Sequence, residues 1–364
     1  MSNKEVISDR QGISMIISFI FALGAILGTG EPEAGRDIAL GTLFGALFAI
    51  PLMLVYARIL YLFPGKDLFE IDNIIFGKKL GTIISLLFIW YTFYTAAKTL
   101  RIYWEFANTA MFPDTPYIVP VVFLVIICVI AVYKGIEVIG RTCEIFAVIT
   151  VAIAVIAAFI FSIPDIHINN AFPVFYNGIK PVLSSSFSSL VHPFGDIVVF
   201  LMAFPNLQSK KSSYKIYLVG LLISGFIMII TIFRNIIVLG ADFSNLFFFK
   251  SQIAVSIIHI GEVFQRLEIL IFAPLLINVF ARLSICIFVC CKGVQKIFNF
   301  DEYRFAIVPI MLLVISFSII IDKNLSGIMK WLIEIAPYYG GFFEIILPVF
   351  VLICEEIKVR RNKS

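Results

Sequence analysis

Apolar residues occur in long runs along this chain, and the polar residues gather in short segments between the runs. Stretches without a charged residue include 38–57, 80–97, 117–133, 145–164, 216–233 and 305–321. A segment that crosses a bilayer needs about 20 apolar residues. In lipid it must also satisfy its backbone hydrogen bonds internally, so each run predicts a helix. A soluble helix would carry polar residues along one face, which these runs lack.

The spacing of the runs predicts an all-α integral membrane protein with about ten transmembrane helices. The expected spans are 13–30, 38–62, 80–103, 117–133, 145–163, 182–204, 216–239, 262–289, 305–321 and 337–353. Composition agrees, since the 364 residues are 60% hydrophobic and only 14% charged, whereas soluble domains carry about 25% charged residues. We expect a single transmembrane domain over residues 1–364 with short termini.

Basic residues are distributed unequally between the two predicted faces. With the N-terminus inside, the outer connections receive only Arg36, Lys180, Arg234, Lys250, Lys323 and Lys330, and most other Lys and Arg residues fall inside. The positive-inside rule therefore predicts cytoplasmic N- and C-termini. The N-terminal segment also fits a cleaved signal peptide. We favour a retained helix, because removing it would spoil this charge pattern.

Two predicted spans, the first and the sixth, carry helix-breaking residues. Each of them is the first helix of one five-helix half. The first span contains Gly24, Gly28 and Gly30, and the sixth contains Pro193 and Gly195. Interrupted helices at corresponding positions of two halves indicate a transporter-type binding site. We therefore expect repeats at about 13–163 and 182–354, with helices 1 and 6 interrupted. Ordinary kinks are the alternative.

Ionisable residues inside the third predicted span share one face. Tyr91, Tyr94, Lys98, Arg101 and Glu105 fall within an arc of about 80°. Intramembrane charges usually face the bundle interior and pair, so we expect an acidic partner for Lys98. The candidates for the acidic partner of Lys98 are Asp196 and Glu268. A snorkelling stripe is the alternative for the outer part of this face.

The eighth predicted span also has one polar side. Glu262 and Arg266 are spaced for an i,i+4 pair, and Glu268 and Arg282 lie on a neighbouring face. Together with the charged residues of the third span they predict an intramembrane polar network. Structural salt bridging is an equal alternative to a role in ligand binding.

Enzymatic and metal chemistry find little support in the sequence. His192 and Asp196 have a one-turn spacing, but Pro193 and Gly195 lie between them and no complete catalytic set accompanies them. The group Cys286, Cys290 and Cys291 lacks a paired CxxC partner and is interpreted as apolar filling. We expect no catalytic residues, no cofactor and no metal.

Several short motifs carry a resemblance to a known family. They are ISDRQ at 7–11, YAR at 56–58, LFPGKDLFEI at 62–71, FLMAFP at 200–205 and RLE at 266–268. In this order and spacing the chain resembles the B subunits of bacterial spore germinant receptors, the GerAB-type endospore germination permeases. The resemblance runs over nearly the whole chain.

The resemblance implies a member of the amino acid–polyamine–organocation superfamily with two inverted five-helix (LeuT-like) repeats. It implies a place in the spore inner membrane beside an A and a C subunit, and recognition of a small germinant, often an amino acid, without nucleic acid. Carried over to this sequence, the ligand-binding residues are Gly24, Ala25, Gly28, Tyr91, Tyr94, Phe194, Gly195, Asp196 and Glu268. An ion-coupled secondary amino acid transporter is the alternative, because fold alone does not fix function.

Overall fold

A helix forms at the position of every predicted span. The computed structural model describes residues 6–27, 32–110, 114–159, 167–204, 206–257 and 269–361. The first half contains α1 (Asp9–Leu27), η1 (Pro32–Asp37), α2 (Ile38–Leu62), α3 (Leu68–Ala110), α4 (Ile118–Lys134) and α5 (Ile136–Phe159). Within the described residues, β-pairing is limited to an isolated parallel bridge between Ile7 and Leu207.

The second half is more broken than the first. It contains η3 (Ile168–Ala171), α6 (Ile179–Ser189), η4 (Leu190–Phe194), η5 (Gly195–Val199), α7 (Phe200–Ala203), α8 (Ser212–Leu239), α9 (Ala241–Ser244), α10 (Lys250–Ser256), α11 (Ile269–Phe298), η6 (Arg304–Ala306), α12 (Ile307–Ile320), α13 (Leu325–Glu334), α14 (Ala336–Gly340), η7 (Gly341–Ile346) and α15 (Leu347–Arg361). Helix α11 continues past residue 289, the predicted end of the eighth span, to Phe298.

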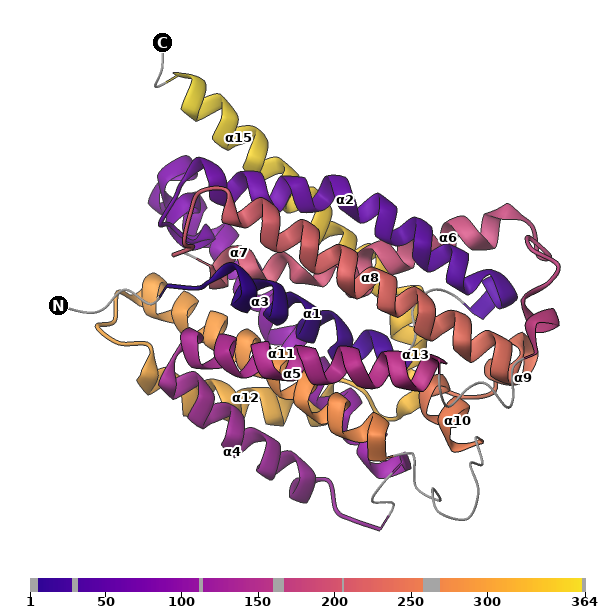
Figure 1. The fold of residues 1–364 in the computed structure, drawn as a ribbon. Coiled ribbons are helices and arrows are strands. Elements are labelled where there is room, and N and C mark those ends of the chain that lie inside the picture. The colour runs from indigo at the N-terminus through magenta and orange to yellow at the C-terminus, as the bar shows by residue number, and fades with distance from the viewer. Residues whose placement is uncertain are drawn as a thin grey trace.

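The long helices lie side by side in one bundle. Figure 1 shows α2, α6 and α8 in one part and α4, α5, α11 and α12 in another, with α1 between them. Helix α1 begins and α15 ends at the same end of the bundle, and α9, α10 and α13 lie at the other end (Figure 1). We call the first the inner end and the second the outer end.

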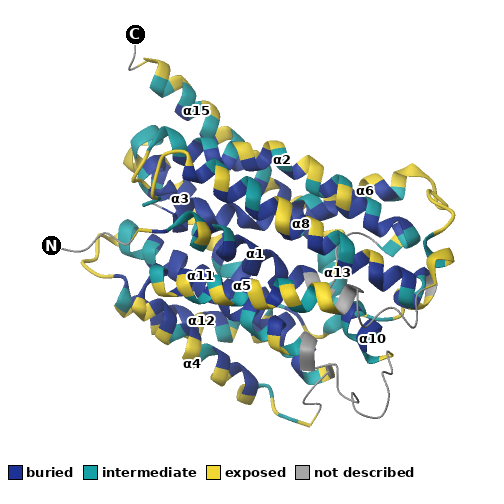
Figure 2. Ribbon diagram, in the orientation of Figure 1, coloured by how far each residue is buried: buried dark blue, intermediate teal, exposed yellow. Residues whose placement is uncertain are grey.

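Apolar side chains cover the outside of the bundle as well as its core. On α4, Phe123, Ile127 and Ile130 are exposed, and on α12 Leu312 and Leu313 are exposed. Figure 2 shows such exposed positions along the outward faces of the long helices. By length and composition, six of the described helices could cross a membrane, or seven if the bent pair α12–α13 counts as one span. An apolar surface on the outside of a helix bundle is what a bilayer requires.

The sixth span is interrupted where the sequence predicted. Helix α6 passes into the π-helical turn η4, whose His192 has non-helical backbone angles (φ −121°, ψ 117°), and then into the 3-10 turn η5. The first span is helical through Gly24 as far as Leu27. Gly28 and Gly30 lie outside the described residues.

Helices α12 and α13 meet at an angle of 95°. This bend turns α13 across the outer end of the bundle instead of continuing the span. Asp322 and Lys323 lie in the short connection at the bend. Helix α13 therefore covers the space between the long helices at the outer end of the bundle.

Candidate functional site

Arg282 of α11 is the centre of a buried polar cluster. Its guanidinium donates from Nε to Oγ1 of Thr99 (3.1 Å), from one terminal nitrogen to the carbonyl of Phe19 (3.1 Å) and from the other to Oδ2 of Asp196 (2.6 Å). The guanidinium also lies over the Phe19 ring, 4.3 Å from its centroid. With 1% exposure, Arg282 joins α1, α3, η5 and α11, which is the kind of planar, multiple contact for which arginine is suited.

Asp196 stands at the break of the sixth span and has partners for both carboxylate oxygens. Besides Arg282, Nδ1 of His192 lies 2.6 Å from its Oδ2. The hydroxyl of Tyr91 donates to its Oδ1 at 3.0 Å. His192 reaches Asp196 across Pro193 and Gly195, because the π-helical and 3-10 turns bring the two side chains together.

Glu344 of η7 joins this cluster from the last span. The Tyr91 hydroxyl lies 2.6 Å from its Oε1, and the Tyr56 hydroxyl donates to its backbone carbonyl at 2.6 Å. Two glycines make room for its carboxyl group. A Cβ atom at Gly195 would lie 2.0 Å from Oε2, and one at Gly340 would lie 2.7 Å from Oε1.

A small cavity of about 40 Å³ adjoins these groups on their outer side. Its lining comes from eight helical elements: Leu23, Tyr91, Tyr94, Thr95, Lys98, Ile102, Val191, His192, Asp196, Arg282, Trp331, Leu332, Ala336, Tyr339, Gly340 and Glu344. A water molecule needs about 10–15 Å³ on this measure, so the space holds about three waters. A larger ligand enters this central cavity only when a wall moves.

Helix α13 roofs the central cavity through a buried ion pair. Nζ of Lys98 lies 2.6 Å from Oδ2 of Asp322, and both side chains are less than a tenth exposed. The same ammonium lies over the Trp331 ring at 4.1 Å. Lys98 therefore has the acidic partner that the sequence predicted. The partner is Asp322 and not Asp196, because the bend before α13 brings the connection over α3.

The neighbouring charges of the third span also reach this connection. Arg101 pairs with Glu105 one turn away, and it donates to the carbonyl of Lys323 at 3.2 Å. The predicted polar face of the third span thus holds the α12–α13 bend at two points, Asp322 and Lys323.

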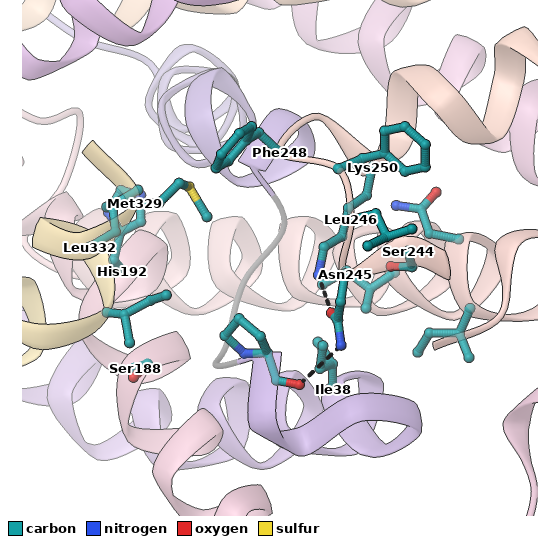
Figure 3. Close-up of a pocket in the computed structure, with 16 residues that line it drawn as sticks. Ile38, Ser188, His192, Ser244, Asn245, Leu246, Phe248, Lys250, Met329 and Leu332 are labelled. Carbon is teal, nitrogen blue, oxygen red and sulfur yellow. Dashed lines mark hydrogen bonds between the residues drawn. The ribbon is translucent and has the colours of Figure 1, made fainter. Parts of the chain in front are cut away.

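A larger cavity of about 220 Å³ lies next to the central one, at the outer end. In Figure 3, His192 and Ser188 stand on one side with Met329 and Leu332 of α13, and Lys250, Asn245 and Ser244 stand on the other. His192 and Leu332 line both cavities. We call this larger space the outer cavity.

Lys250 is the charged group in the lining of the outer cavity. Its Nζ donates to Oδ1 of Asn245 at 3.2 Å. Burial lowers the pKa of Lys250, since a low-dielectric surrounding disfavours the ammonium form. A carboxylate that entered this cavity would relieve that cost by pairing with Lys250.

The predicted ligand-binding residues take different places. Tyr91, Tyr94 and Asp196 line the central cavity. Gly24 packs against other helices instead, because a Cβ there would lie 2.7 Å from Met228 and 3.0 Å from Pro193. Phe194 is fully buried, near Gly225 of α8. Gly28, Glu268 and the side chain of Ala25 lie outside the described residues, as do Glu262 and Arg266 of the predicted polar network. The role of these residues in ligand binding remains a prediction.

Sequence reasoning missed Glu344 and Asp322. Glu344 stands alone in the tenth predicted span, and an acid within a span is itself a signal of function. Asp322 follows directly after an apolar run, so it was taken as a loop residue. No periodicity of α12 could show that the chain turns there by 95°.

Comparison with known proteins gives a consistent result. A family model described as "Spore germination protein" matches residues 6–326. The chain is 32% identical to spore germination protein KB of Bacillus subtilis (strain 168), over 99% of this chain and 97% of that protein. It is 25% identical to spore germination protein YndE of the same organism, over 80% of this chain and 81% of that protein.

Solved structures with a similar fold are membrane transporters. Mhp1, a nucleobase-cation-symport-1 family transporter in a closed conformation with bromovinylhydantoin bound, matches with a TM-score of 0.71 at 12% identity, over 94% of this chain and 77% of that one. MhsT in complex with L-phenylalanine matches with a TM-score of 0.55 at 12% identity, over 94% and 97% of the two chains. At such identities the likeness concerns the fold alone, and it confirms the predicted all-α, LeuT-like fold class.

Proposed function

The chain belongs to the family of spore germination proteins, and on this premise we propose that it is the germinant-sensing, permease-like B subunit of a spore germinant receptor. The observation that carries the proposal is the match to germination protein KB over nearly the full length of both chains. The proposal extends to an A and a C subunit as partners and to the inner membrane of the spore as location. It includes no catalytic step.

A small amino acid is the germinant class that the two cavities favour. The outer cavity, at about 220 Å³, offers Lys250 to a carboxylate and lies toward the outer end. The central cavity offers aromatic rings and carboxyl groups, which suit an ammonium and a modest apolar side chain. Because both oxygens of Asp196 already have partners, an ammonium there competes with Arg282. We propose that the germinant binds first in the outer cavity and that α13 then moves.

Replacing Lys250 by methionine should weaken the germinant response. A hydrogen bond to a charged group is worth about 1.5–3 kcal/mol, so the half-maximal germinant concentration should rise by about ten- to a hundredfold. Spores of the bacterium that carries this gene can be scored for response to a panel of amino acids, with immunoblots of the membrane fraction. Lys330→Met is the matched control, since Lys330 lies on exposed α13 with its side chain 72% exposed.

Two outcomes of this experiment would count against the proposal. A normal dose–response for Lys250→Met at normal abundance would place carboxylate recognition elsewhere. Spores without the gene that still respond to every amino acid would contradict the sensor function itself. Uptake of a labelled amino acid by vesicles containing the purified chain would instead support the alternative, a transporter.

We also propose that both termini lie in the cytoplasm. The Lys and Arg asymmetry supports this orientation, and α1 and α15 having their terminal ends together is compatible with it (Figure 1). Single cysteines placed at Asn3 and Asn362 should resist a membrane-impermeant maleimide added from outside, and should react once the membrane is opened. Labelling of either position in sealed, oriented membranes would reverse or break the topology.

A further inference from the structure

Glu344 is an acid buried at the centre of the bundle. It is 1% exposed, and its hydrogen-bonded oxygen Oε1 contacts the Tyr91 hydroxyl. Its other oxygen, Oε2, has no hydrogen-bond partner within the described part of the chain. Arg282, which lines the same cavity as Glu344, is bound to Asp196. An ionised carboxylate in such a place would be far costlier than a neutral carboxylic acid.

Counting protons at Tyr91 leads to the same conclusion. One phenolic hydroxyl lies 3.0 Å from Oδ1 of Asp196 and 2.6 Å from Oε1 of Glu344. A hydroxyl has a single proton to donate, so two ionised acids could not both be satisfied by it. The second contact needs a proton on one of the carboxyl groups. Asp196 is held as a carboxylate by Arg282, so the additional proton belongs to Glu344.

The described groups that surround Glu344 offer no unpaired cation to replace that proton. They are Tyr56 of α2, Tyr91 of α3, His192 of η4, Asp196 of η5, Arg282 of α11 and Tyr339 of α14. Arg282 and His192 both contact Oδ2 of Asp196, and Lys98, which lines the same cavity, pairs with Asp322. Gly195 and Gly340 leave room for the carboxyl group, which a Cβ atom at either position would meet.

We propose that Glu344 is a proton-binding site and that it shares its proton with Asp196 through the Tyr91 hydroxyl. In the transfer, the O–H bond of Glu344 breaks as a new O–H bond forms at Tyr91. The original Tyr91 proton passes at the same time to Oδ1 of Asp196. The number of protons is unchanged and no further reactant is needed. His192 contacts the same carboxylate and lines the outer cavity, so this chain of groups ends where ions and water can enter.

Infrared spectroscopy of the purified protein tests the proposal without any germinant. Solvated glutamates are ionised at neutral pH, so they do not give the carbonyl band of a carboxylic acid. The spectrum of the natural chain minus that of Glu344→Gln should show this band with the area of one carboxyl group. Glu334→Gln is the matched control, because that side chain is 58% exposed, and its difference spectrum should show loss of a carboxylate band.

A second variant keeps the test decisive if Glu344→Gln fails to fold. Tyr91→Phe removes only the hydroxyl, so the acid band should persist at the same area and move to higher frequency. Loss of a carboxylate band in Glu344→Gln would overturn the proton site. A band that does not move in Tyr91→Phe would overturn the sharing through Tyr91. Neither result would bear on the germinant response of spores, which is scored separately.

Discussion

Replacing Arg282 with methionine should destabilise the protein by about 3–5 kcal/mol, the cost of leaving one member of a buried ion pair alone. The substitution removes three hydrogen bonds that join α1, α3 and η5 to α11. It also leaves the carboxylate of Asp196 without its strongest partner. Thermal unfolding of the detergent-purified protein, followed by tryptophan fluorescence, measures the loss, and a lower abundance in membranes should accompany it.

Two further variants separate the charge of Arg282 from its geometry. Arg282→Lys keeps the charge but cannot reach three acceptors at once. Its stability should therefore fall between that of the natural chain and that of Arg282→Met. Asp196→Asn combined with Arg282→Met removes both charges, and this pair should be more stable than Arg282→Met alone. If the losses of stability caused by Asp196→Asn and Arg282→Met simply add in the double variant, the ion pair is not the source of the stability.

Breaking the roof over the central cavity should expose that cavity to the outside. In Asp322→Asn, Lys98 loses its ion pair and retains its contacts with the Trp331 and Tyr94 rings. A cysteine at Tyr94, which lines the cavity, should then react with an impermeant maleimide faster by on the order of tenfold or more. The six native cysteines lie buried or half-buried, so their background labelling should be low.

The labelling rate needs a reference position that the ion pair does not control. A cysteine at Lys330 on the exposed side of α13 should react equally fast with and without Asp322→Asn. Lys98→Met should mimic Asp322→Asn, since either change leaves one charge unpaired. Equal rates at position 94 in all three backgrounds would mean that α13 is held down by its apolar contacts instead.

The sequence predicted the parts of this molecule that depend on local pattern. Apolar runs predicted the spans, and the residues at 193 and 195 predicted the break in the sixth span, because both signals lie in consecutive residues. The face shared by Tyr91, Tyr94 and Lys98 followed from helical periodicity and is the face that lines the central cavity. Such features need no knowledge of how distant segments pack.

The partners of these residues could not be predicted in the same way. Asp322 lies 224 positions from Lys98, and Glu344 lies 253 positions from Tyr91. Which acid meets which base depends on how far one helix slides along another and on the bend before α13. One-dimensional patterns do not contain that information. A sequence can therefore state that Lys98 has a partner without stating which one.

The tight packing around Glu344 has a consequence for how this site can change over evolutionary time. A methyl group at position 195 or 340 collides with the carboxyl oxygens, so neither glycine can drift while an acid occupies position 344. A side chain at 340 would also meet Val191, whose Cγ1 lies 2.3 Å from such a Cβ atom, so shortening residue 344 alone would not free that position. Substitutions at positions 195 and 344 therefore depend on one another, whereas the lining of the outer cavity contains neither residue.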